Sequence, residues 1–187
     1  AETIEMQTTG QAKVSRIVIG DRAYFKDKKI DIQTLLTINR KNKVVELQPS
    51  VVKIEEAAYQ VGGTISYGGH TNLDLKLEGK NTNVQSLLSL LPQDITRDYG
   101  QYRSKGDVYF NGTVKGKSSG KHVPSINVSF GARDASFFHP DAKQRVEKIF
   151  LTGSFTNGEK QNAASSVLEL KELKGMLNGR PFKGNLK

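Results

Sequence analysis

The sequence predicts a mainly β fold in which one antiparallel sheet curls into a groove, a partly open barrel or a sandwich, with one or two short helices. Three observations lead to this prediction. Apolar and polar residues alternate with a period of two over most of the chain, which is the spacing of half-buried strands. Turn signals rich in glycine separate these stretches. No strand–helix–strand rhythm is present, which argues against a parallel sheet covered by helices.

The alternating stretches divide the chain into roughly nine to eleven strands, which we assign to a single β-rich domain of residues 1–187. The clearest stretch is TNLDLKLEG, where Leu73, Leu75 and Leu77 share one face. Residues 29–38 alternate in the same way, and only Leu35 breaks the pattern. The other residues predicted on the apolar faces include Tyr59, Val61, Ile65, Val108, Phe110, Val114, Ile126, Val128, Phe130, Ala132, Ile149, Leu151, Phe155, Leu168, Leu170, Leu173, Leu177, Phe182 and Leu186.

Turns are predicted at four places between these strands. They fall at Gly68-Gly69, at residues 117–120, at Asn157-Gly158 and at Asn178-Gly179. Asn-Gly is favoured in two-residue hairpins because both positions need positive φ. Turns this short join antiparallel neighbours.

One segment departs from the β pattern. Four apolar residues follow the i, i+3, i+4, i+7 spacing of one helical face and predict a short helix near residues 83–91. Thr82 or Asn83 can cap its start, and Pro92 ends it. We expect its apolar stripe to plug one end of the curled sheet or to cap an edge that would otherwise invite pairing, either as a structural lid or as a gate. The stripe consists of Val84, Leu87, Leu88 and Leu91.

Composition narrows the classes of function. The formal charge of +9 favours anionic partners, but the Lys and Arg residues are spread along the chain and form no dense basic helix. The absence of cysteine excludes disulfides and thiolate metal sites. No apolar run approaches the ~18 residues of a membrane-spanning helix. We expect the chain to be a fragment of a longer protein.

No motif points to catalysis, a cofactor or a metal ion. Gly116-Lys117-Ser118 matches the end of a phosphate-binding loop, but Asn111 stands where that loop needs its first glycine. The three histidines lie far apart in predicted turns, and no G-x-S-x-G elbow is present.

A sheet that is apolar on one face must cover that face. It can fold onto a second sheet, close into a barrel, or curl into a trough that holds apolar ligands.

The order of several segments resembles the C-terminal region of the AsmA-like family of bacterial envelope proteins, in its Bacteroidetes-type versions. The segments are ISYGGHTNLDLKLEGKNTNVQSLLSLLPQD, YGQYRSKGDVYFNGTVKGK, PSINVSFGARDASFFHP and LKGMLNGRPFKGNL, and the resemblance covers residues 52–187 best. It implies a periplasmic module of a protein anchored in the inner membrane by a segment absent from this chain. It also implies a role in outer-membrane biogenesis, binding or transport of phospholipid in an apolar β groove, and no enzymatic activity.

Two lines of inference, the alternation and the resemblance, favour a lipid-handling module of the cell envelope. The residues predicted to line its groove are Tyr59, Val61, Ile65, Leu73, Leu75, Leu77, Phe110 and Ile126. Positive residues at the rim are predicted to hold anionic headgroups. Two alternatives stay open: a closed β scaffold that binds envelope proteins through an edge strand, and a basic β-barrel that binds nucleic acid, although we expect no nucleic acid.

Overall fold

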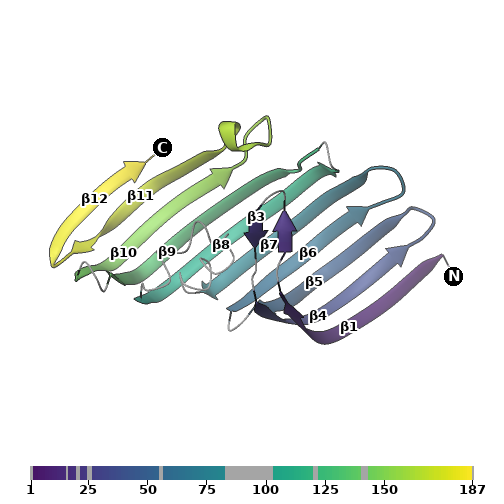
Figure 1. Cartoon of the computed structure of the whole chain (residues 1–187), viewed down its shortest axis with the longest axis horizontal. Coiled ribbons are helices and arrows are strands. Elements are labelled where there is room, and N and C mark those ends of the chain that lie inside the picture. Colours follow the sequence, from purple (N-terminus) through teal and green to yellow (C-terminus); the bar gives the residue numbers. More distant parts are fainter. Residues whose placement is uncertain are drawn as a thin grey trace.

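The structure, a computed structural model, describes residues 2–15, 17–19, 22–24, 27–54, 57–82, 103–119, 122–139 and 143–186. Ten strands form one antiparallel sheet, and each pairs with the next strand of the sheet along the chain (Figure 1). The prediction of a mainly β, antiparallel fold is confirmed. The ten strands are β1 (Thr3–Val14), β4 (Lys28–Asn39), β5 (Val44–Ile54), β6 (Ala57–Ser66), β7 (Thr71–Thr82), β8 (Arg103–Ser118), β9 (Ser125–His139), β10 (Gln144–Thr156), β11 (Val167–Leu177) and β12 (Arg180–Leu186).

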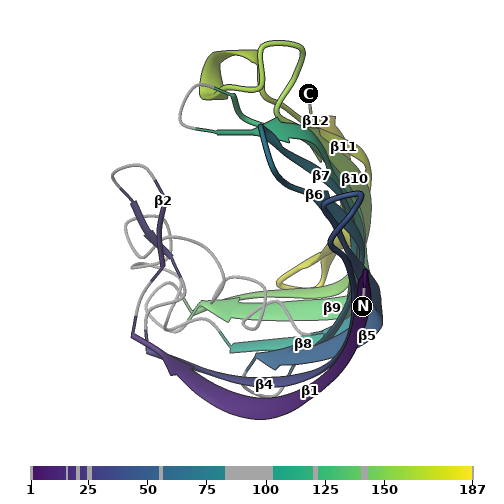
Figure 2. The same ribbon diagram turned by 90° about the vertical axis from the view of Figure 1, so that its right-hand side faces the viewer.

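The sheet is an open trough whose strands curve from one lip to the other (Figure 2). A separate hairpin of β2 (Ile17–Ile19) and β3 (Arg22–Tyr24) stands on the concave side. The strands β1 and β12 form the two ends, and among the described strands each has one neighbour. Of the forms that the sequence left open, the described strands adopt the groove. Ten strands about 4.8 Å apart make a trough about 43 Å long.

The strands bend because β-bulges interrupt their pairing near the middle of the sheet. Register shifts occur between Gly79 and Thr82 of β7, and at matching heights in the pairs β8–β9, β9–β10 and β10–β11. Asp134 and Lys148 adopt left-handed backbone there, with φ of 47° and 52°. A bulge adds a residue to one strand and bends it, so a line of bulges folds the sheet across its strands. Another bulge lies at residues 48–50 of β5, which there has one residue more than the facing part of β4. β4 itself pairs with β1 without a shift, so Leu35 breaks the alternation because it lies on the convex face, where it is 45% exposed.

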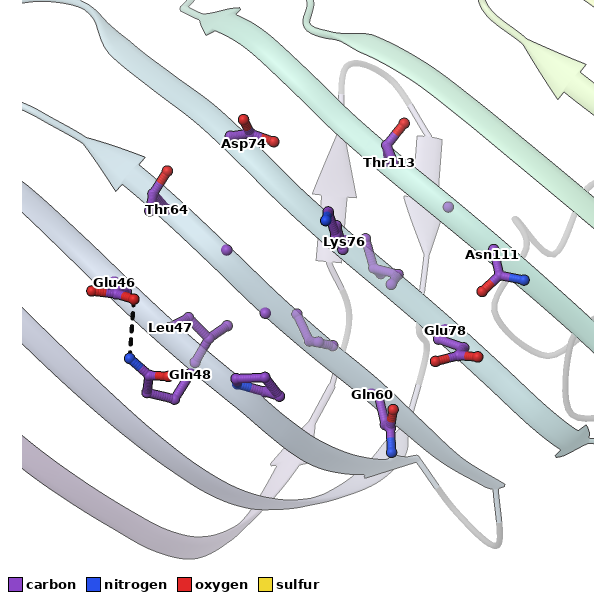
Figure 3. A pocket seen from close by; sticks show the side chains of 16 residues that line it. Glu46, Leu47, Gln48, Gln60, Thr64, Asp74, Lys76, Glu78, Asn111 and Thr113 are labelled. Carbon is purple, nitrogen blue, oxygen red and sulfur yellow. Dashed lines mark hydrogen bonds between the residues drawn. The ribbon is translucent and has the colours of Figure 1, made fainter.

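The pairing register gathers the apolar residues of successive strands into rows on one face. One row runs across six strands and consists of Leu36, Leu47, Gly63, Leu75, Val114 and Ile126. The polar row beside it consists of Thr37, Glu46, Thr64, Asp74, Lys115 and Ser125. In Figure 3 the polar side chains point toward the viewer and the β2–β3 hairpin lies behind the sheet. Because that hairpin is on the concave side, the polar face is convex and the apolar face lines the trough.

The core is small for a chain of this length. One cluster of buried residues lies on the concave face where β8, β9 and β10 meet, and it consists of Val108, Ala132, Ala135 and Ile149. The accessible surface is 12788 Å², against about 8,900 Å² for a compact protein of this mass. Among the described residues, only the β2–β3 hairpin stands on the concave side, so no second layer of described strands covers most of the apolar face.

On the concave face, phenylalanine rings occupy the space above glycines of neighbouring strands. A Cβ on Gly153 would lie 2.6 Å from the Phe130 ring and 2.8 Å from the Glu169 carbonyl oxygen. A Cβ on Gly79 would lie 2.4 Å from the Phe110 ring, and one on Gly175 2.8 Å from the ring of Phe182. These rings fill the space over the glycines rather than the lumen of the trough.

Gly153→Ala is expected to lower the free energy of unfolding by about 1–3 kcal/mol, because neither the backbone oxygen nor the ring can move away without strain. Gly184→Ala is the matched control, since nothing lies within 4 Å of its added Cβ. Urea unfolding of the two variants checks the prediction, and equal midpoints would contradict it.

Two of the predicted turns differ from the structure. Asn178-Gly179 is the expected hairpin, with φ of 49° and 81°. Asn157-Gly158 is not a two-residue hairpin, because it opens a loop that contains the 3-10 turn η2 (Ala163–Ser165). The turn predicted at residues 117–120 starts later, because Lys117 and Ser118 belong to β8. The predicted helix of residues 83–91 lies outside the described residues, and so do Val84, Leu87, Leu88 and Leu91.

Candidate functional site

The candidate site is the apolar concave face of the trough, over β6 to β9. The eight residues predicted to line a groove all lie on this face, in adjoining rows. Val61 faces Leu77 across β6 and β7, and Ile65 faces Leu73. Leu75 connects through Val114 to Ile126. Tyr59 and Phe110 both flank Gly79, with ring centroids 5.8 Å apart. The structure therefore brings all eight together, although they span 68 positions of the chain from Tyr59 to Ile126.

The apolar face extends to both ends of the trough. At the β1 end, Ile4 and Met6 are each 42% exposed. At the β12 end, Leu168 and Leu186 are 48% and 58% exposed. The register connects these positions to the central rows, since Met6 faces Leu36 and Leu186 faces Leu170. The middle of the trough is more enclosed than its ends.

Of the eight predicted lining residues, Tyr59 alone carries a polar group in its side chain, and the structure buries it in the apolar face. The residue is 4% exposed, and its hydroxyl has no hydrogen-bond partner among the described residues. Burial raises the pKa of the Tyr59 phenol above its ordinary value of 10.0. The cause is desolvation, which penalises the charged phenolate.

Tyr59→Phe is expected to gain stability relative to the parent protein as the pH rises above about 10. The folded state holds the phenolic proton more tightly than the unfolded chain, so ionisation of the phenol costs no stability below about pH 10. The unpaired buried hydroxyl adds a cost that does not depend on pH. Above that pH the unfolded chain loses its proton first, and the parent loses stability that Tyr59→Phe keeps. Urea unfolding at about pH 8 and about pH 11 measures the difference in the free energy of unfolding between Tyr59→Phe and the parent protein. If the difference in the free energy of unfolding were the same at both pH values, the prediction would be contradicted.

The hollow in Figure 3 is a different feature, on the polar convex face. Its volume is about 540 Å³, and it forms where Gly62 lacks a side chain beside the bulge at Pro49. Its charged lining residues are of both signs: Glu46, Asp74, Lys76 and Glu78. The Gln48 amide donates to Glu46 at 3.0 Å, and Asp74 pairs with Lys115, outside the hollow, at 2.9 Å. The sheet separates this hollow from the trough, so it is not part of the groove.

The described residues offer no other obvious chemical centre. No three His, Asp or Glu side chains of the described ranges come together as a metal site. Within those same ranges, no helix has the length and apolar character needed to cross a membrane. Gly116-Lys117-Ser118 lies at the end of strand β8 rather than before a helix, so a nucleotide-binding loop is not formed.

Sequence reasoning missed one cluster. His70 and His122 are distant in the sequence, but their rings lie 6.3 Å apart, in the turns that follow β6 and β8. The signal that could have found it is the meander itself, because the turns after every second strand share one lip of the sheet.

Comparisons with protein-family models, with curated proteins and with solved structures find no match for this chain. The AsmA-like resemblance therefore stays a prediction from the sequence.

Proposed function

We propose that this chain is a non-catalytic module that binds or conducts lipid acyl chains along the concave face of its trough. The proposal includes the setting that the AsmA-like resemblance implies. That setting is a periplasmic segment of a protein anchored in the inner membrane, serving outer-membrane biogenesis. The observation that carries the proposal is the register, which joins apolar residues of six strands into continuous rows on the concave side of an open sheet.

Both the exposed apolar area and the length of the trough suit acyl chains. An exposed apolar face of this extent is unfavourable in water, and acyl chains are one means of covering it. Each methylene that leaves water contributes about 0.8 kcal/mol. The trough, about 43 Å long, exceeds the ~15 Å of one half of a bilayer's hydrocarbon core. Whole acyl chains therefore fit along it, across the strands.

The first test is mass spectrometry of an organic extract of the purified chain, together with native mass spectrometry of the intact protein. We expect phospholipid in at least stoichiometric amount, bound without a covalent link. A chain that is free of lipid and also rejects added phospholipid vesicles would contradict the proposal.

A second candidate, a module that binds envelope proteins, rests on strand β1. Its twelve residues form one end of the sheet, and eleven of them are exposed. Because its outer edge has no neighbour among the described strands, another strand can pair with it. Cross-linking in cells through Glu5 or Gln7 would test this, and the absence of any partner at both positions would count against it.

A further inference from the structure

The strongest feature outside the groove is a second hollow at one lip of the trough. Its volume is about 390 Å³, and its walls come from the end of β8, the segment before β9 and the loop after β10. Figure 2 shows this loop and the ends of these strands at the same lip. Its basic lining residues are Lys115, Lys117, His122 and Lys160, and no carboxylate lines it among the described residues.

A buried asparagine joins the two walls of this hollow. Asn157 is 6% exposed. Its Oδ1 accepts from the backbone N–H of Ile126 at 2.8 Å, and its Nδ2 donates to the Pro124 carbonyl at 2.9 Å. Its own carbonyl accepts from the Ser165 hydroxyl at 2.9 Å. The loop that carries Lys160 is therefore held against the segment that carries His122, and the hollow is a built feature of the fold.

The charge of the hollow is only partly neutralised. Lys115 pairs with Asp74 at 2.9 Å on the convex side. Lys117 and Lys160 have no ion-pair partner among the described residues, and Glu159, next to Lys160, does not line the hollow. The Ser119 hydroxyl and His122 Nδ1 lie 3.0 Å apart, which orients the imidazole. Cations held together without carboxylates favour an anion.

We propose that this lip hollow binds a phosphate group, with Lys117 and Lys160 as its main cationic contacts. Lysine binds phosphate as a compact positive charge, and a hollow of this size accepts a phosphate monoester or diester. Lys115 and Lys117 lie on the convex side of β8, so a lipid with its acyl chains in the trough would reach this hollow over the lip. That the phosphate is the headgroup of such a lipid rests on the proposed function. A free phosphate would use the same chemistry without the trough.

The test is an amide NMR titration of the chain with three probes: dihexanoyl phosphatidic acid, dihexanoylglycerol and inorganic phosphate. The variant Lys117→Glu/Lys160→Glu removes the cations of the hollow. Its matched control is Lys13→Glu/Lys183→Glu, because both lysines are exposed, lie opposite other lysines and give the same change in net charge. We expect the lip variant to weaken phosphatidic acid binding by about tenfold or more, and the control to change it much less.

The probes separate the two proposals. If phosphatidic acid binds more tightly than inorganic phosphate and Leu75→Arg in the trough also weakens it, the ligand is a phospholipid headgroup and both proposals stand. If the two bind equally and Leu75→Arg has no effect, the hollow is a site for free phosphate and the groove function fails. If dihexanoylglycerol binds but the lip variant weakens phosphatidic acid binding no more than its control does, the phosphate site is wrong.

Discussion

Leu75→Arg is expected to abolish lipid binding while the sheet still folds. Leu75 lies in the middle of the trough, between Gly63 of β6 and Val114 of β8. An arginine there places a charge where acyl chains would lie, and a charge buried against hydrocarbon costs far more than the lost apolar contact. Leu75 is only partly buried, so the longer side chain can reach toward solvent. We expect lipid affinity to fall by at least about tenfold, or roughly 1.4 kcal/mol.

The control for this variant places the same residue on the opposite face. Asn111→Arg lies on the convex side of β8, is exposed, and faces Glu78 across the strands. It adds the same charge to the protein and leaves the trough untouched. Binding of a fluorescent fatty acid, with thermal unfolding of both variants, is the measurement. Equal lipid affinity in the two variants would contradict the groove.

A gentler substitution keeps the test valid if Leu75→Arg unfolds. Leu75→Thr retains a residue suited to strands and removes part of the apolar contact. It is expected to weaken lipid binding to a degree between the parent and the arginine variant. Loss of folding in both Leu75 variants, with lipid affinity per folded molecule unchanged, would make Leu75 an ordinary core residue.

The alternation of apolar and polar residues predicts the sheet because it can be recognised within each strand by itself. A period of two separates polar from apolar side chains whatever the neighbouring strands are. In a meander the next strand along the chain is also the next strand in the sheet. The apolar faces of successive strands therefore lie side by side and form one apolar face of the whole sheet. For that reason residues as far apart as Tyr59 and Ile126 could be assigned to one lining without any knowledge of the register.

The curvature and the lip could not be predicted in the same way. Curvature comes from bulges, and a bulge leaves only a faint trace in the sequence, such as Pro49 within the alternating stretch of β5. The lip depends on Asn157-Gly158, which has the signature of a tight hairpin. There the asparagine side chain bonds to the neighbouring loop at Pro124 and Ile126 instead of serving a local turn. Contacts made across about thirty residues are not visible in a local pattern.

Asn157→Leu is expected to cause a large loss of stability for a single substitution at the lip. Leucine has a similar size but makes neither side-chain hydrogen bond. The Ile126 N–H and the Pro124 carbonyl then lose their partner in a partly buried place. Each group left unpaired costs about 1–3 kcal/mol, so we expect the free energy of unfolding to fall by roughly 2–4 kcal/mol. For a chain of this length that corresponds to a drop in Tm of about 5–12 °C.

Asn127→Ala is the matched control, because its amide makes an exposed hydrogen bond to Ser125 at 3.2 Å in the same strand. We expect it to change the free energy of unfolding by less than about 0.5 kcal/mol. Thermal unfolding compares the two, and equal Tm values would show that Asn157 does not hold the loop. The two walls of the lip hollow carry His122 and Lys160, and Asn157 joins them. Asn157→Leu should therefore also weaken phosphate binding at temperatures where the sheet is still folded, with Lys117 and Lys160 both present.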